Sequence, residues 1–205
     1  MKHVFVFIPL LLTTVLAQPW DGEYIPAEAG TPDKAMPAWK IYVKNPGTEV
    51  DVQEDVLITD TTATSEGRIV FEQTNSWNGE PGTEVEVVVR VVSPMDPNLT
   101  AGQVLFSGAF GWQSLSIGHN HIGLSAQRTK YPLDMSEFQT LNIRITAEEL
   151  VEIRVNAEPE PVLAAPLNVS ADNLSFNLSF GDLSKTPNIG GKLEWKSIRW
   201  KQGEK

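Results

Sequence analysis

Two pairs of side chains in this chain have the types and spacing that acid–base chemistry requires. Glu84 and Glu86 are two residues apart in an alternating run, which places both carboxylates on one face of a strand. His119 and His121 have the same spacing, so their imidazoles lie on one side of an extended chain. Paired carboxylates can hydrolyse a glycosidic bond that they flank. Two imidazoles can bind zinc or copper, or act with Tyr131 as the base of a polysaccharide lyase.

Each pair also has an interpretation without chemistry. Glu84 and Glu86 fit a solvated strand face whose charges pair with Arg90 or with an arginine of a neighbouring strand. His119-Asn120-His121 fits a polar hairpin tip, and no third metal ligand is evident nearby in the sequence. The enzyme interpretation therefore requires the acid pair, or the histidine pair with Tyr131, to converge in a groove with an arginine, the candidates being Arg90, Arg144 and Arg154.

Two loop tryptophans are candidates for stacking against a sugar ring. Trp77 lies beside Asn78 in a turn, and Trp112 follows a Phe-Gly pair. An aromatic face packs against the C–H face of a pyranose while polar neighbours bind its hydroxyls. The alternative is that both anchor their loops, since large aromatic side chains usually bury. The candidate ligand-binding residues are Trp77, Asn78, Arg90, Trp112, His119, His121 and Arg144.

These residues have to be positioned by regular structure. Polar and apolar residues alternate through almost all of the chain after residue 50, which predicts β-strands. The clearest stretch is Leu174–Phe180, with four apolar residues on one face and three small polar residues on the other. No segment has a convincing helical stripe. The predicted strands are 39–44, 52–60, 68–73, 83–92, 103–108, 113–118, 122–127, 139–146, 150–156, 161–166, 174–181 and 193–201.

These strands predict an all-β fold in which two antiparallel sheets pack face to face as a jelly-roll β-sandwich. One whole sheet face is then free to bind a ligand. Trp195 and Trp200 fall on opposite faces of a regular last strand, so we expect at least one of them in the core. The rest of the predicted core is Val85, Val87, Val89, Val91, Leu141, Ile143, Ile145, Val151, Ile153, Val155, Leu174, Phe176, Leu178 and Phe180.

The N-terminal segment predicts export. A short basic start precedes an apolar run that ends in small residues before Gln18, and the run is too short to span a bilayer. We assign residues 1–17 to a signal peptide and 18–37, rich in Pro, Gly, Ala and acids, to an exposed lead-in that is draped over the sandwich or disordered. Residues 38–205 form one sandwich domain, and the expected location is secreted or periplasmic.

The charge of the chain limits its partners. The formal net charge is −10, so the protein is repelled by phosphate backbones, and nucleic acid is excluded as a partner. An anionic polysaccharide would have to be met by a local basic patch. No later segment is long and apolar enough to be transmembrane, and the chain has no cysteine.

Several motifs resemble those of a known family. Phe180-Gly181-Asp182-Leu183-Ser184, a glycine-containing loop and then Glu194–Trp200 resemble the ending of concanavalin A-like lectin/glucanase domains, including laminin G-like modules of secreted bacterial proteins. Thr83–Val91 and Phe138–Ile143 resemble two further strands of these domains. The resemblance covers about residues 39–201 and implies the fold. It departs from the family at Lys196-Ser197, where Asp-Tyr is usual.

The resemblance also suggests a metal site. Asp182 stands at the family's usual place for a structural calcium ligand, and Asp60 is a candidate for a second ligand. Calcium takes six to eight oxygens, often from distant segments. The alternative is that Asp182 caps its own turn. Family glucanases carry a third acid after a pair such as Glu84 and Glu86, and this chain lacks it.

We therefore expect a secreted, non-catalytic, lectin-like protein that binds a glycan, a polysaccharide or a cell-surface protein. The main alternative is a glycoside hydrolase or polysaccharide lyase on the same fold. A third alternative is a structural or assembly module, which an exposed apolar face would indicate. The sequence leaves the oligomeric state open.

Overall fold

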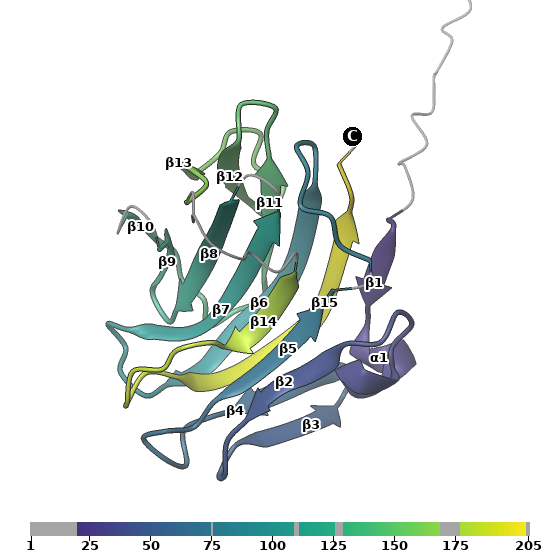
Figure 1. The fold of residues 1–205 in the computed structure, drawn as a ribbon. Helices are drawn as coiled ribbons and strands as arrows, with labels where there is room; N and C mark the ends of the chain where they lie inside the picture. The colour runs from purple at the N-terminus through teal and green to yellow at the C-terminus, as the bar shows by residue number, and fades with distance from the viewer. Residues whose placement is uncertain (1–19, 75, 109–110, 126–128, 169–176, 204–205) are drawn as a thin grey trace, which may run out of the picture.

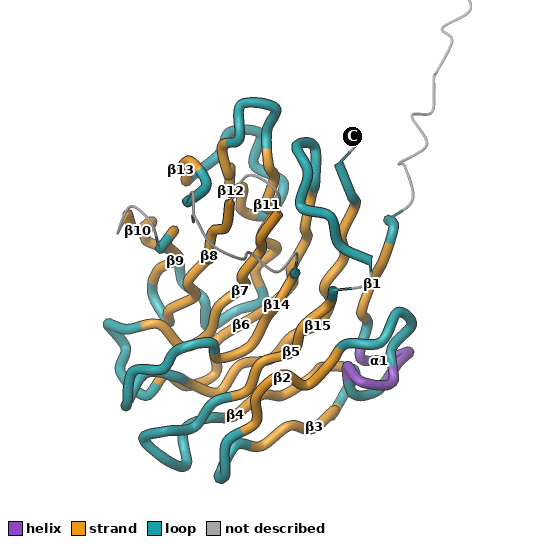
Figure 2. Tube along the Cα trace, viewed as in Figure 1, coloured by secondary structure: helices purple, strands orange, loops and turns teal. Residues whose placement is uncertain are grey.

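The computed structural model describes residues 20–74, 76–108, 111–125, 129–168 and 177–203. Two antiparallel sheets are stacked face to face (Figure 1), and most of the chain is strand, with short helical turns beside one end (Figure 2). The predicted all-β sandwich is confirmed. No helix among these residues is long and apolar enough to span a bilayer.

The eight-stranded sheet has the order β13-β12-β11-β6-β15-β4-β3, with β1 paired to the second half of β15. Its strands are β1 (Gly22–Tyr24), β3 (Glu49–Gln53), β4 (Val56–Asp60), β6 (Glu84–Pro94), β11 (Gln139–Ile145), β12 (Leu150–Val155), β13 (Leu163–Pro166) and β15 (Gly191–Lys201).

The seven-stranded sheet has the order β10-β9-β8-β7-β14-β5-β2, so its centre joins segments that are far apart in the sequence. Its strands are β2 (Lys40–Lys44), β5 (Ile69–Gln73), β7 (Thr100–Gly108), β8 (Gly111–Gly118), β9 (His121–Leu124), β10 (Thr129–Pro132) and β14 (Leu178–Asp182). Two short helical turns, α1 (Pro26–Ala29) and η1 (Pro32–Lys34), lie between β1 and β2.

The inward faces of both sheets form one core, as alternation predicts. The residues predicted for the core on β6, β11 and β12 are all buried, as are Leu178 and Phe180 of β14. Leu174 and Phe176 lie outside the described residues. Trp195 and Trp200 are both fully buried because a bulge between Trp195 and Ser197 shifts the register of β15.

One local prediction differs from the structure. The predicted strand 52–60 is a hairpin of β3 and β4, because Glu54 and Asp55 adopt left-handed backbone angles and reverse the chain. The lead-in 18–37, expected to be draped over the sandwich or disordered, lies on the sandwich where it is described, with buried and exposed side chains interspersed. Tyr24 of β1 is fully buried, stacks on Phe180 and donates a hydrogen bond to the Gly30 carbonyl.

Candidate functional site

A groove of about 520 Å³ lies on the outer face of the seven-stranded sheet. Strand pairing aligns Ser114 of β8, Leu105 of β7, Ser179 of β14 and Glu72 of β5 in one row across this face. Each of these residues is adjacent in sequence to a core residue, so alternation turns its side chain outward. Ser114 and Ser179 form a floor of small side chains, which leaves space above the sheet.

Trp112 lines the groove at the start of β8. Its backbone is fixed on both sides, since it pairs with Ser107 of β7 and exchanges two hydrogen bonds with Asn168, at 3.1 and 2.9 Å. The side chain is half-buried, so part of the indole faces the groove. This is the amphipathic arrangement with which an aromatic ring stacks on a sugar.

Polar groups along the groove are held in fixed positions. The Asn177 Nδ2 donates to Glu72 Oε1 at 2.6 Å, and the Ser107 hydroxyl donates to Asn177 Oδ1 at 2.9 Å. The Glu72 carboxylate therefore keeps a second oxygen for which the described residues provide no hydrogen-bond partner. The Ser114 hydroxyl is buried and likewise has no partner among them. The second Glu72 oxygen can accept from a ligand hydroxyl without first being reoriented, because Glu72 is only half-buried.

Trp77 and Asn78 do not reach this groove. Trp77 is 5% exposed, and its indole N–H donates to the Ser107 carbonyl at 2.6 Å, so it anchors its loop in the core. This position agrees with the alternative interpretation, in which Trp77 anchors its loop, and not with sugar stacking in this groove. The Asn78 amide donates to the Gly203 carbonyl at 3.2 Å, which ties the same loop to the C-terminal segment.

The predicted acid pair lies on the opposite side of the sandwich, on the outer face of the eight-stranded sheet. Glu84 pairs with Arg144 of β11 at 3.7 Å, and Glu86 pairs with Arg199 of β15 at 3.6 Å. Arg90 pairs with a further glutamate of β15, Glu194, at 2.7 Å, and its guanidinium stacks on an aromatic ring. These cross-strand ion pairs agree with the solvated-face interpretation and not with a hydrolytic pair.

The predicted histidine site lies at the turn between β8 and β9, at the other end of β8 from Trp112. The His121 ring is buried over Gly118, and Nδ1 is 2.8 Å from Asn120 Oδ1. Burial lowers the pKa of His121, with a smaller contribution from the charge of Lys130. His119, His121 and Tyr131 are not among the residues that line the groove.

The two predicted calcium ligands are held by their own neighbours. The Asp182 carboxyl accepts hydrogen bonds from Thr61 Oγ1 at 3.0 Å and from the Ser184 amide at 3.1 Å. Asp60 Oδ1 accepts two from Thr62, at 2.9 and 2.6 Å. Burial raises the pKa of Asp182 to about 6, although these hydrogen bonds and Arg68 lower it.

Calcium takes six to eight oxygens, which can come from carboxylates, backbone carbonyls and water, so Asp182 and Asp60 would each be only one ligand of a larger set. Within the described ranges, no group of three or more His, Asp or Glu side chains is close enough to hold a metal ion. Both aspartates act as turn caps here, and calcium binding stays a prediction without a fitting ligand set.

Sequence reasoning missed most of the groove. Besides Trp112, its lining includes Tyr42, Arg68, Glu72, Gln103, Ser114 and Ser179. One signal was present in the sequence, because the alternation of Leu174–Phe180 places Asn177 and Ser179 on the outward face. Nothing local showed which strands lie beside them.

No protein-family model matches the chain, and a search of curated protein sequences finds no match. Solved structures do match. The carbohydrate esterase vb_24B_21 from Shiga toxin-encoding bacteriophage phi24B has a TM-score of 0.60 at 13% identity, covering 89% of this chain and 97% of that one. The carbohydrate recognition domain of Emp47p has a TM-score of 0.53 at 12% identity, covering 90% and 96%.

A third match is the legume lectin-like domain from Entamoeba histolytica, with a TM-score of 0.51 at 12% identity, covering 88% of this chain and 97% of that domain. At these identities the likeness shows the fold alone. The chain thus has a concanavalin A-like, legume lectin-like fold. The narrower likeness to laminin G modules stays a prediction.

Proposed function

We propose that this chain is a secreted or periplasmic, non-catalytic lectin-like protein that binds a glycan in the groove of the seven-stranded sheet. The observation that carries the proposal is the position of Trp112, half-buried at one end of a groove with a serine floor and fixed polar groups. A sugar presents a C–H face and a rim of hydroxyls, and this groove offers a partner to each.

The structural neighbours support the proposal at the level of fold. One of them is described as a carbohydrate recognition domain, and another as a legume lectin-like domain. The proposal of export rests on the signal-peptide pattern of residues 1–17, which lie outside the described residues.

The absence of catalysis is proposed from the charges of the groove. Among the described residues that line it, Glu72 is the one acid, and it is bound to Asn177. Glycoside hydrolysis usually needs two carboxyl groups about 5 to 10 Å apart. Glu84 and Glu86 cannot complete such a pair, because the core separates them from Glu72.

The test is a glycan-array screen of the mature protein together with a polysaccharide-degradation assay on each ligand found. We expect binding without product release, and loss of binding in Trp112→Ala. Trp20→Ala is the matched control, because Trp20 is also half-buried but precedes β1 beside the other sheet. Product release, or equal binding losses in the two variants, would contradict the proposal.

A further inference from the structure

One end of the groove carries an arginine for which the described residues supply no ion-pair partner. Arg68 directly precedes β5 and lines both the groove and an adjoining hollow of about 220 Å³ at the sheet edge. Its backbone is fixed to Thr48, whose hydroxyl accepts from the Arg68 amide at 3.1 Å and donates to the Arg68 carbonyl at 3.2 Å. These two hydrogen bonds fix the backbone at the point from which the Arg68 side chain extends.

Arg68 differs from the other arginines that the structure describes. Each of the others pairs with a glutamate within 4 Å: Arg90, Arg144, Arg154 and Arg199. Arg68 has no such ion pair with any described residue, and its Nε is buried without a hydrogen-bond partner. The residue as a whole is half-buried, so the other guanidinium donors can meet an acceptor supplied from outside the chain.

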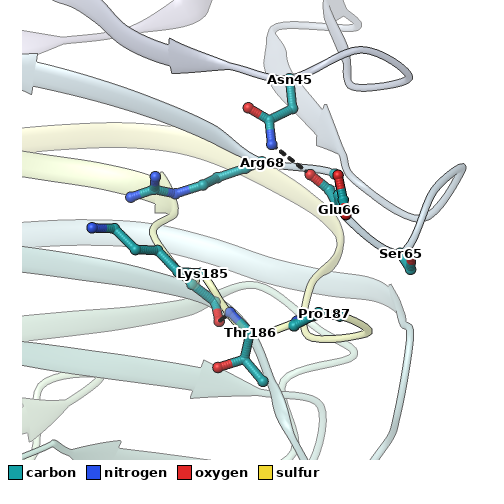
Figure 3. Close-up of a pocket in the computed structure, with 9 residues that line it drawn as sticks. Asn45, Ser65, Glu66, Arg68, Lys185, Thr186 and Pro187 are labelled. Carbon is teal, nitrogen blue, oxygen red and sulfur yellow. Dashed lines mark hydrogen bonds between the residues drawn. The ribbon is translucent and has the colours of Figure 1, made fainter.

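A second cation lies beside it. Lys185, in the loop after β14, lines the same hollow and is exposed. Figure 3 shows the Lys185 and Arg68 side chains extending in the same direction. Glu66 also lines the hollow but is within ion-pair distance of neither cation among the described groups. Asp182 is near enough for Arg68 to lower its pKa, yet it is buried and bound to Thr61 and Ser184.

The groove connects this cationic end to Trp112. Arg68 and Thr74 lie at opposite ends of β5, six residues apart, which is about 20 Å at ~3.3 Å per residue. Thr74 is at the Trp112 end, where Ser107 and Asn177 also lie. A ligand that contacts both ends is therefore longer than a single sugar.

We propose that Arg68 and Lys185 form an anion subsite, so that the glycan bound in the groove is acidic and carries carboxylate or sulfate groups. This inference rests on the proposed function and narrows its ligand class. The net charge of −10 repels an acidic polymer at long range, so its affinity has to come from close contact at this subsite. A planar guanidinium binds carboxylate and sulfate oxygens with two parallel hydrogen bonds.

The test compares matched oligosaccharides by calorimetry: an oligogalacturonate, its carboxyl-reduced neutral form, and a sulfated oligogalactan of the same length. We expect one acidic probe to bind at least about tenfold more tightly than the neutral form, which is the effect of one charge-assisted hydrogen bond. The tighter of the two acidic probes identifies the anionic group. Added salt is expected to weaken acidic binding only.

Substitutions of Arg68 and Lys185 test whether these two side chains cause the preference for acidic probes. Arg68→Gln and Lys185→Gln are each expected to weaken acidic binding about tenfold more than they weaken neutral binding. Arg144→Gln and Lys196→Gln remove the same charges from the other sheet and are expected to change neither. Equal binding of acidic and neutral probes, or equal effects of Arg68→Gln and Arg144→Gln, would overturn the inference and leave the proposed function standing. Binding of none of the three probes would also overturn the inference, whereas the proposed function is overturned only by the outcomes given for the glycan array and the Trp112→Ala variant.

Discussion

Asp182 gives the sharpest prediction about stability, because its carboxyl is buried without a charged partner in contact. Burial raises the pKa from 3.8 to about 6 in the folded protein. This difference corresponds to about 3 kcal/mol, at ~1.36 kcal/mol per pH unit. The side chain is only 3% exposed, so solvent screens this contribution little.

Whether stability rises or falls with pH depends on whether the folded or the unfolded state holds the Asp182 proton more tightly. Below about pH 4 the carboxyl is neutral in both states, and its contribution to stability is fully present. Between about pH 4 and pH 6 the unfolded chain ionises first, so stability is lost as pH rises through the folded-state pKa. Asp182→Asn removes this titration, while its amide can still bond to Thr61 and Ser184.

The measurement is urea unfolding of both proteins, followed by tryptophan fluorescence at several pH values. Relative to the wild type, Asp182→Asn is expected to gain about 3 kcal/mol in the free energy of unfolding between about pH 4 and pH 7. Subtracting the wild-type free energy of unfolding from that of the variant at each pH removes the contributions of the other carboxylates, because they titrate in both proteins. A difference that stays constant over this range would refute the reasoning.

Three further predictions concern the other candidate residues. Trp77→Ala is expected to lower the free energy of unfolding by about 3 to 5 kcal/mol, measured by urea denaturation, because Trp77 is a core anchor; a loss below about 1 kcal/mol would contradict this. Glu86→Gln breaks a half-exposed ion pair with Arg199, so we expect at most about 1 kcal/mol and unchanged glycan affinity; lost affinity would return Glu86 to the binding site. EDTA is expected to leave glycan affinity and thermal stability unchanged, since Asp60 and Asp182 are turn caps; a lower Tm in EDTA would indicate a bound cation.

The fold was predictable because alternation is a local property. A run such as Leu174–Phe180 determines which face is apolar, and repeated runs require two sheets to bury those faces. The burial of Trp200 was less predictable, because a bulge after Trp195 changes which side of the sheet the later residues of β15 face. Backbone irregularities of this kind have no strong local signal in the sequence.

The groove was only partly predictable because it depends on strand order. Glu72, Leu105, Ser114 and Ser179 become neighbours only in the order β8-β7-β14-β5, which no local pattern reveals. The same reason explains the two loop tryptophans. Trp77 and Trp112 have similar sequence surroundings, yet one packs in the core and the other lines the groove.

The central claim is that the glycan occupies the groove, and the absence of cysteine in this chain allows a direct test. Thr74→Cys places one thiol on the exposed wall of the groove, and Ser93→Cys places one on β6 of the other sheet, also exposed. Each variant is labelled with a bulky maleimide and tested for binding to the best ligand from the array. The account predicts that labelling at position 74 abolishes binding and that bound ligand slows this labelling, with neither effect at position 93. Full binding after labelling at position 74 would contradict it.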